Sequence, residues 1–144
     1  MLKRGQIAAD PEQGQWVRLL VLRDRPGAGT ASHDAGAAGV ELRSAIVVGH
    51  AGFHGPPGVN GGATPGALEL GYTVFERWRG QGLASEAGGA LLRWARSAHG
   101  VTHFYGSTSP DNAASRAVLT RLGFKQTGEQ IDEDDGLELV FELR

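Results

Sequence analysis

Apolar side chains recur along this chain with two different periods, and the change of period separates strands from helices. Over residues 67–75 (ALELGYTVF) they occupy alternate positions, a pattern typical of a strand that buries one face. From Ala84 to Ala98 they return every three or four positions instead, as on the buried face of a helix. The two patterns predict a strand over 67–75, followed by a helix that ends at Gly100.

The same periods, together with capping residues, assign the rest of the chain. Ser109 followed by Pro110 is typical of a helix start, because serine caps the first turn and proline fits its first position. This second helix is predicted to end at Gly123. Residues 2–9 are consistent with one or two helical turns, and residues 49–54 either continue the strand before them or begin a turn. Further strands are predicted at 16–23, 42–48, 102–108, 124–131 and 137–143.

The order of these elements predicts an α/β domain with a mixed, mostly antiparallel sheet flanked by helices. A strand–helix–strand unit joins parallel strands through a right-handed crossover, whereas hairpins on either side add antiparallel neighbours. The length of 144 residues suits one domain, so 1–144 is expected to fold as a single unit. Residues 24–41 are rich in Gly and Ala and are expected to form a flexible loop.

Composition narrows the classes of function. The chain has no cysteine, which excludes disulfides, thiolate metal sites and a cysteine nucleophile. A net charge of −2 gives no reason to expect a nucleic acid or a membrane surface as the main partner. No apolar run reaches the length of a membrane span, so we expect a cytoplasmic protein. His50 and His54 have no clear third ligand nearby, so no metal is predicted, and packing or hydrogen bonding is favoured for both.

A glycine-containing loop, RGQGLA at 79–84, lies between the 67–75 strand and the helix after it. Gly80 and Gly82 permit a tight turn, the first amides of the helix favour an anion, and Arg79 is suited to phosphate oxygens. A Walker A loop is excluded because no Lys-Ser/Thr pair follows the last glycine. The dinucleotide-binding motif G-x-G-x-x-G is excluded because position 85 is Ser85 rather than glycine. The alternative is a plain turn that needs glycine only for its geometry.

Two motifs, in order around one predicted strand, make the chain resemble the GNAT (GCN5-related N-acetyltransferase) superfamily. The first is the Arg/Gln-x-x-Gly-x-Gly/Ala signature, which Arg79, Gly82 and Ala84 satisfy. The second is an asparagine followed by a helix that ends in Gly-Phe, here Asn112 and the LGF of 122–124. The resemblance implies the GNAT fold, in which the strand before the loop splays away from the next, parallel strand.

Within that superfamily the chain looks like the RimJ/RimL-type N-terminal acetyltransferases. The features in common are ELGY at 69–72, a glycine-marked strand at 48–53, and Ser115 where many members carry tyrosine. Members of the family usually begin with a strand and one or two helices before the strand predicted here at 16–23, whereas only residues 1–15 precede it. The resemblance therefore implies that these N-terminal elements are missing or replaced.

The resemblance also implies an acetyl-CoA site, with acetyl-CoA as co-substrate. The main chain of Val74 would pair with the pantetheine arm, and the loop would surround the pyrophosphate. Asn112 would bind near the pantetheine, and Ser115, one helical turn later, would lie by the thioester sulfur. The implied cofactor-binding residues are Val74, Arg79, Gly80, Gln81, Gly82, Leu83, Ala84, Asn112 and Ser115.

The implied reaction is direct attack of a primary amine on the thioester of acetyl-CoA. An α-amine, with a pKa of about 8, loses its proton more easily than a lysine with a pKa of about 10.4. The acceptor is therefore expected to be the α-amine of a protein N-terminus or the amine of a small molecule.

Glu69 and Ser115 are the candidate catalytic residues. Glu69 is predicted to lie opposite the Leu68 and Leu70 face of its strand, where it would act as the base directly or through water. The alternative is a glutamate that simply faces solvent. Ser115 would give a proton to the leaving thiolate, or else would only be small enough to make room for the cofactor.

Two other functions stay open at this level. A GNAT-like domain could bind acyl-CoA without turnover, as a sensor or an interaction module. A truncated product could also cover its apolar faces by self-association, for example in a homodimer. The acidic stretch 132–135 is expected to be a solvated turn, with the mouth of the acceptor site as the alternative.

Overall fold

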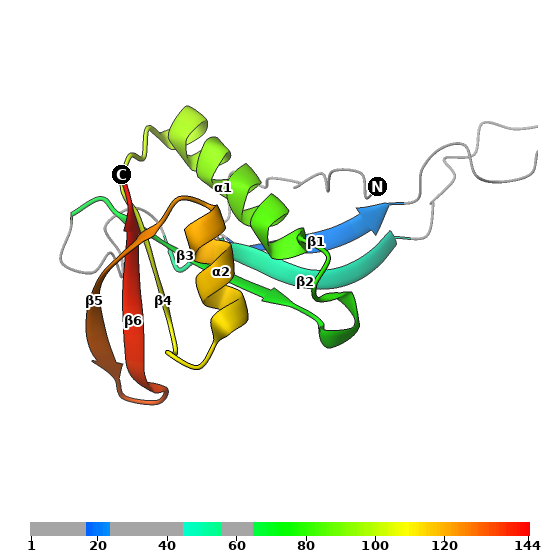
Figure 1. Ribbon diagram of the computed structural model, residues 1–144. Helices are drawn as coiled ribbons and strands as arrows, with labels where there is room; N and C mark the ends of the chain where they lie inside the picture. Colours follow the sequence, from blue (N-terminus) through cyan, green and yellow to red (C-terminus); the bar gives the residue numbers. More distant parts are fainter. Residues whose placement is uncertain (1–16, 24–44, 56–64) are drawn as a thin grey trace, which may run out of the picture.

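The computed structural model describes residues 17–23, 45–55 and 65–144, and the strands form one six-stranded sheet (Figure 1). They lie in the order β1-β2-β3-β4-β6-β5, with β3 and β4 parallel and the other neighbouring pairs antiparallel. The predicted mixed, mostly antiparallel sheet is therefore confirmed. The elements in chain order are β1 (Val17–Arg23), β2 (Ala45–Phe53), β3 (Leu68–Val74), the 3-10 turn η1 (Glu76–Trp78), α1 (Leu83–His99), β4 (Phe104–Thr108), α2 (Ala113–Arg121), β5 (Lys125–Asp132) and β6 (Gly136–Leu143).

The predicted strands and helices are found where expected, with shifted ends. The strand predicted at 42–48 continues to Phe53 in β2. Residues 49–53 therefore continue the strand rather than begin a turn. The start of that strand lies outside the described residues. The same holds for residues 1–15, with the helical turns expected at 2–9, and for the flexible loop expected at 24–41.

β3 and β4 pair only where they begin, and this produces the splay that the family resemblance implied. The parallel register joins Leu68 to Phe104 and Glu69 to Tyr105 and goes no further. On its other edge β3 stays paired with β2 as far as Val74. β4 likewise stays paired with β6 to its end. The later halves of β3 and β4 are therefore held apart by their outer partners, and a gap opens between them.

The face of the sheet that carries α1 and α2 holds the core. Both helices lie on the same side of the sheet in Figure 1. Leu83, Ala87, Leu91 and Ala95 fall four residues apart on α1, are buried, and cluster with strand residues such as Phe104. Burial of a leucine as complete as that of Leu91, which is 1% exposed, stabilises the fold by roughly 1.5–3 kcal/mol. α1 is thus fixed to the sheet, and the loop before it is fixed with it.

The prediction that Ser109 caps the second helix is wrong. α2 begins at Ala113, and its N-cap is Asn112, whose Oδ1 accepts a hydrogen bond of 3.0 Å from the Ser115 amide. Ser109 instead opens a turn, because its carbonyl accepts from the Asn112 amide at 3.0 Å. Proline at the second position favours such a turn, so Ser109-Pro110 fits the turn as well as it fits a helix start.

The predicted end of the second helix is confirmed. Gly123 has a φ of +94°, a conformation that favours glycine after the last helical turn. The Phe124 amide then donates to the Leu119 carbonyl at 3.0 Å, and the Phe124 side chain is buried in the core. This closure holds α2 against β4, opposite the gap between the two splayed strands.

Candidate active site

A groove with a volume of about 480 Å³ lies between the end of β3, the loop that follows it and α2. Gly80 and Gly82 in this loop have φ values of +74° and +78°, which an L side chain rarely adopts. The prediction that Gly80 and Gly82 permit a tight turn is therefore confirmed. Gly82 is also the N-cap of α1, so the turn delivers the chain directly into the helix.

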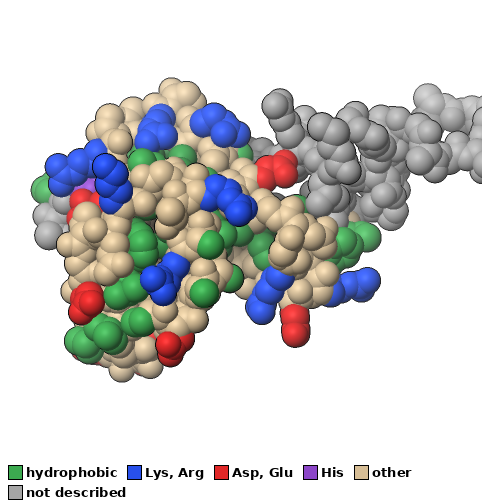
Figure 2. Space-filling view, in the orientation of Figure 1, with side chains coloured by type: hydrophobic (Ala, Val, Ile, Leu, Met, Phe, Trp, Pro, Cys, Tyr) green, Lys and Arg blue, Asp and Glu red, His purple; other side chains and the backbone are tan. Residues whose placement is uncertain are grey.

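The groove is suited to an anion. No side chain caps the N-terminus of α1, so its first amides, which have no partner within the helix, keep their capacity to donate. Arg79 and Arg121 line the groove, and its described lining includes no Asp or Glu. Figure 2, in the orientation of Figure 1, shows basic side chains spread over this helix-bearing face. An anionic group would meet donors and cations on several sides.

The structure joins two of the predicted cofactor-binding residues directly. Nε of Arg79 donates a hydrogen bond of 3.0 Å to the Val74 carbonyl, so the end of β3 holds the arginine beside the loop. Gln81, in contrast, is exposed and is not among the residues that line the groove. The other residues predicted for the cofactor all line it: Gly80, Gly82, Leu83, Ala84, Asn112 and Ser115.

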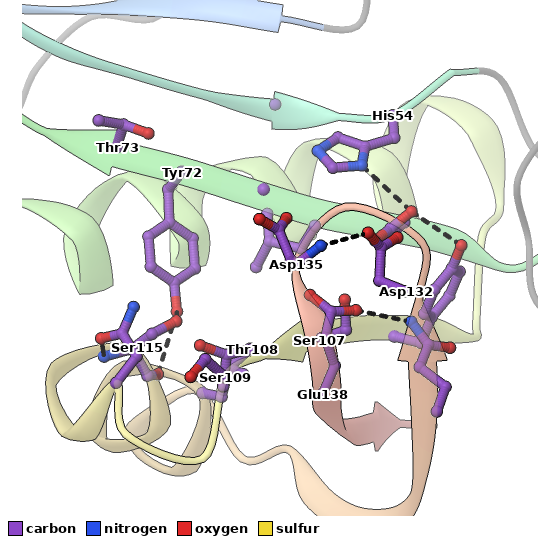
Figure 3. Close-up of a pocket in the computed structure, with 18 of the residues that line it drawn as sticks. His54, Tyr72, Thr73, Ser107, Thr108, Ser109, Ser115, Asp132, Asp135 and Glu138 are labelled. Carbon is purple, nitrogen blue, oxygen red and sulfur yellow. Dashed lines mark hydrogen bonds and ion pairs between the residues drawn. The ribbon is translucent and has the colours of Figure 1, made fainter.

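A larger cavity, of about 1060 Å³, lies along the polar side chains of β3 and β4 and reaches the β5–β6 hairpin. Four carboxylates line it, and Figure 3 shows how those of the hairpin project toward β3. Its described lining includes no Lys or Arg. The carboxylates are those of Glu69, Asp132, Asp135 and Glu138. This cavity is therefore suited to a cation, in contrast to the groove.

Glu69 is held by two side chains in this cavity. Its Oε2 accepts a hydrogen bond of 2.9 Å from the Tyr105 hydroxyl and lies 3.1 Å from Nδ1 of His54. The prediction that Glu69 lies opposite Leu68 and Leu70 is confirmed, since both leucines are buried in the core while Glu69 lines the cavity. Only 16% of the Glu69 side chain is exposed, so the solvent-facing alternative does not hold.

His54 takes the hydrogen-bonding role that was favoured for it. The hydrogen bond to Glu69 raises the pKa of His54 above its ordinary value, against a smaller lowering by burial. Gly71 makes room for the ring: a Cβ there would lie 2.5 Å from Nε2 of His54. Glycine at this position of β3 therefore allows the imidazole to lie over the strand, beside the carboxylate (Figure 3).

The acidic hairpin turn is ordered by its own backbone. Oδ1 of Asp132 accepts from the amides of Asp134 and Asp135, at 2.8 and 2.9 Å, and these two bonds lower the Asp132 pKa. The expected solvated turn is confirmed, because Glu133, Asp134 and Asp135 form a turn and are exposed. Asp132 and Asp135 also line the cavity together with Glu138, and a role at the mouth of an acceptor site stays a prediction.

Tyr72 and Ser115 span the gap between the splayed strands. The Tyr72 hydroxyl donates to the Ser115 carbonyl at 3.1 Å and lies 2.9 Å from Ser115 Oγ. In Figure 3 the Tyr72 side chain extends from β3 directly toward Ser115 on α2. Burial raises the pKa of Tyr72, and the hydrogen bond to Ser115 lowers it by less.

The same pair stands where the two cavities meet. Tyr72, Thr73, Asn112 and Ser115 line both the basic groove and the acidic cavity. An anion bound in the groove and a cation bound in the cavity would therefore approach each other at this pair. Two sites of opposite charge with a shared boundary suit a reaction between two different substrates.

Two of these residues were not expected in the site. Tyr72 lies on the same face of its strand as Leu68 and Leu70, as the alternation predicts, and its ring packs against the core. Its hydroxyl reaches the site because Tyr72 lies past the last position where β3 pairs with β4. Tyr105 carried no functional prediction; its signal was the alternation along β4, which places it on the same face as its register partner Glu69.

The comparisons with known proteins agree with this geometry. The family model of the acetyltransferase (GNAT) domain matches residues 6–125 of the chain. The chain belongs to the GNAT family. The predicted likeness to RimJ/RimL-type enzymes is confirmed by 34% identity over 62 residues to the ribosomal protein uS5-alanine N-acetyltransferase of Escherichia coli (strain K12). That match covers 43% of this chain and 32% of the relative. The matched part of this chain therefore spans about a third of the length of the relative.

Solved structures of other acetyltransferases share this fold. An acetyltransferase from Agrobacterium tumefaciens str. C58 is 28% identical, with a TM-score of 0.55, over 72% of this chain and 56% of that one. RimL, a ribosomal L7/L12 alpha-N-protein acetyltransferase in complex with coenzyme A, is 24% identical, with a TM-score of 0.57, over 67% and 54%. The likeness to RimL shows the fold alone.

Two further expectations concern membranes and metals. In the part of the chain that the structure describes, no helix is long and apolar enough to cross a bilayer. Among the same residues, no three His, Asp or Glu side chains gather as metal ligands. A cytoplasmic location and a reaction without metal stay predictions.

Proposed function

We propose that this GNAT chain is an N-acetyltransferase that moves the acetyl group of acetyl-CoA to a primary amine, with residues 1–144 forming a single domain. The observation that carries the proposal is the pair of cavities: a basic groove and an acidic cavity that share Tyr72, Thr73, Asn112 and Ser115. Acetyl-CoA carries several phosphate charges, and an amine acceptor reaches the site as an ammonium ion. Each substrate therefore matches one cavity in charge.

The residues of the groove fit acetyl-CoA. Uncapped amides at the start of α1, together with Arg79, suit a pyrophosphate. Ser85 adds an independent sign, because its hydroxyl is buried without a hydrogen-bond partner among the described residues and the residue lines the groove. Asn112 and Ser115, at the shared boundary, would meet the pantetheine end. Acetyl-CoA supplies the activated acyl group; the protein supplies its binding and the proton transfers.

The names of the relatives favour an α-amine as the acceptor. One acts on the alanine of ribosomal protein uS5, and the other is named an alpha-N-protein acetyltransferase. Four carboxylates around the larger cavity favour any ammonium group, so the amine of a small molecule fits the same cavity. We propose a protein N-terminus first and a small amine second.

Glu69 is the proposed base. Its Oε2 is engaged by Tyr105 and lies beside His54, while no described residue bonds to Oε1, which leaves that oxygen for the proton of the amine. Proton transfer runs directly or through one water. The proton for the leaving sulfur comes from the hydroxyl groups at the shared boundary, where Ser115 lies.

Calorimetry with acetyl-CoA, against CoA and ATP, tests the binding half of the proposal. We expect micromolar binding of acetyl-CoA that Arg79→Ala weakens roughly tenfold or more, since hydrogen bonds to charged groups contribute about 1.5–3 kcal/mol. Arg77→Ala is the matched control. Arg77 lies 5.2 Å from the centroid of the Trp78 ring and does not line the groove, so its loss should leave the affinity unchanged.

Release of CoA thiol tests the transfer half. The acceptors are an octapeptide that begins with alanine and spermidine, each added to acetyl-CoA and the wild-type protein. Thiol release that depends on either amine supports an acetyltransferase. Tight acetyl-CoA binding with no release from either amine would instead support the non-catalytic acyl-CoA-binding module.

A further inference from the structure

The Tyr72 phenol occupies the boundary between the two cavities. Tyr72 lies on the core-facing side of β3, beyond the last position where β3 pairs with β4. Its hydroxyl reaches Ser115 of α2 there. Its ring packs against the core, and its hydroxyl lies at the opening that both cavities share. Tyr72 is thus one of the residues that a reacting group at this boundary would meet.

Ser115 orients the phenol with two oxygens. The carbonyl accepts the phenol proton at 3.1 Å, and Oγ lies 2.9 Å from the phenol oxygen. The Asn112 cap fixes the Ser115 amide at 3.0 Å, so the turn that bears both oxygens is rigid. No described carboxylate or guanidinium is hydrogen-bonded to Tyr72, so its proton is shared with Ser115 alone.

The chemistry at this boundary requires an acid. The carbon–sulfur bond breaks with its electron pair on sulfur, so the sulfur departs as a thiolate, and with a thiol pKa of about 8.5 that thiolate takes up a proton at neutral pH. A phenol, with an ordinary pKa of about 10, is a far stronger acid than the aliphatic hydroxyl of a serine. Partial burial raises the pKa of Tyr72, so the phenol carries its proton at neutral pH.

We infer that Tyr72 is the acid that protonates the departing sulfur, and that Ser115 is a positioning residue that holds the phenol. The inference rests on the proposed acetyl transfer. As the amine nitrogen bonds to the acyl carbon and the carbon–sulfur bond breaks, Tyr72 gives its proton to the sulfur. Glu69 takes the proton of the amine and passes it to solvent, and solvent returns a proton to Tyr72. The products are an amide and a neutral thiol, so no other reactant is needed.

The first test counts protons rather than turnovers. A donor beside a thiolate favours its ionised form, so CoA binding should release part of a proton at a pH of about 7.5, below the thiol pKa. Calorimetry of CoA binding in two buffers with different heats of ionisation measures that release. We expect it in the wild type and in Ser97→Ala, a control on α1 that removes a hydroxyl outside both cavities, and we expect none in Tyr72→Phe.

The second test is turnover with acetyl-CoA and the alanine octapeptide. Tyr72→Phe keeps the ring and its packing, so acetyl-CoA affinity should change by less than about threefold while kcat falls about 10²–10⁴-fold, as for loss of a general acid. Proton release and kcat that both match the wild type would overturn the role of Tyr72 alone. A wild-type protein that neither binds acetyl-CoA nor releases thiol would overturn the proposed function, and this inference with it.

Discussion

The hydroxyl oxygens of Tyr72 and Ser115 lie 2.9 Å apart, although the two residues belong to different elements on either side of the splay. Tyr72 belongs to β3 and Ser115 to the first turn of α2. Their contact crosses the line where the basic groove meets the acidic cavity. Both substrates of the proposed reaction would meet at this contact. In the proposed mechanism Tyr72 gives the proton and Ser115 positions the phenol, so variants of the two residues should differ in turnover.

Ser115→Ala should reduce turnover much less than Tyr72→Phe. The alanine variant loses Oγ but keeps the carbonyl that accepts the Tyr72 proton at 3.1 Å. Loss of one hydrogen bond costs about 0.5–1.5 kcal/mol, so kcat should fall by roughly tenfold or less. Steady-state kinetics with acetyl-CoA and the alanine octapeptide measures it, with Ser97→Ala on α1 as the control. A loss as large as that of Tyr72→Phe would make Ser115 the acid instead.

Glu69→Gln should abolish most of the turnover and leave acetyl-CoA binding intact. The amide keeps the size of the side chain but cannot take a proton from the amine, so kcat should fall about 10²–10⁴-fold. Calorimetry and thiol release measure the two quantities. Glu142→Gln is the matched control, because Glu142 also lies 3.0 Å from a histidine, His103, but does not line the acidic cavity. Equal activity of the two variants would exclude Glu69 as the base.

The His54–Glu69 pair should make stability depend on pH in one direction. The pKa of His54 is raised in the folded protein from an ordinary 6.5. The ion pair therefore stabilises the fold fully below pH 6.5, and this stabilisation is lost as the pH rises through the higher pKa of the folded state. The ring is 54% exposed, so the effect should stay below about 1 kcal/mol. Urea unfolding of the wild type and His54→Gln should differ more at low pH than at high pH.

His50→Gln serves as the control for that measurement, since no described carboxylate forms an ion pair with His50. It should show no such trend across the same pH range. A difference between wild type and His54→Gln that grows with pH would contradict the ion pair.

Gly82→Ala should weaken both the fold and the affinity for acetyl-CoA. The residue has a φ of +78°, where an L side chain costs about 1–2 kcal/mol, and relief of that strain would turn the first amides of α1 away from the groove. Gly128→Ala is the control, because that glycine has open space and no positive φ. Urea unfolding and calorimetry should show a loss for the first variant and changes below about 0.5 kcal/mol for the second.

The glycine turn before α1 could be predicted from the sequence because its signal is local. Gly80 and Gly82 are needed for backbone conformations that depend only on their own neighbours, and the periodic helix after them marks where the amides begin. The face of Glu69 followed equally well from alternation within one strand. Each of these predictions depended on one continuous stretch of the chain.

The contact at the boundary could not be predicted in that way. It depends on where the pairing of β3 and β4 stops, and the stop at Glu69 and Tyr105 is set by outer strands that lie far away in the sequence. Alternation therefore predicted the face on which the Tyr72 ring packs, but not the contact of its hydroxyl with Ser115. The cap of α2 was missed for a different reason: Ser109-Pro110 satisfies a turn and a helix start equally, and only the hydrogen bond from the Ser115 amide to Asn112 distinguishes them.

A crystal structure of the complex with acetyl-CoA tests the central claim most directly. The account predicts that the pyrophosphate contacts the amides of the Gly80–Ala84 loop and that the thioester sulfur lies within hydrogen-bond distance of the Tyr72 hydroxyl. Acetyl-CoA bound elsewhere, or bound in the groove with its sulfur turned away from Tyr72 and the acidic cavity, would contradict it.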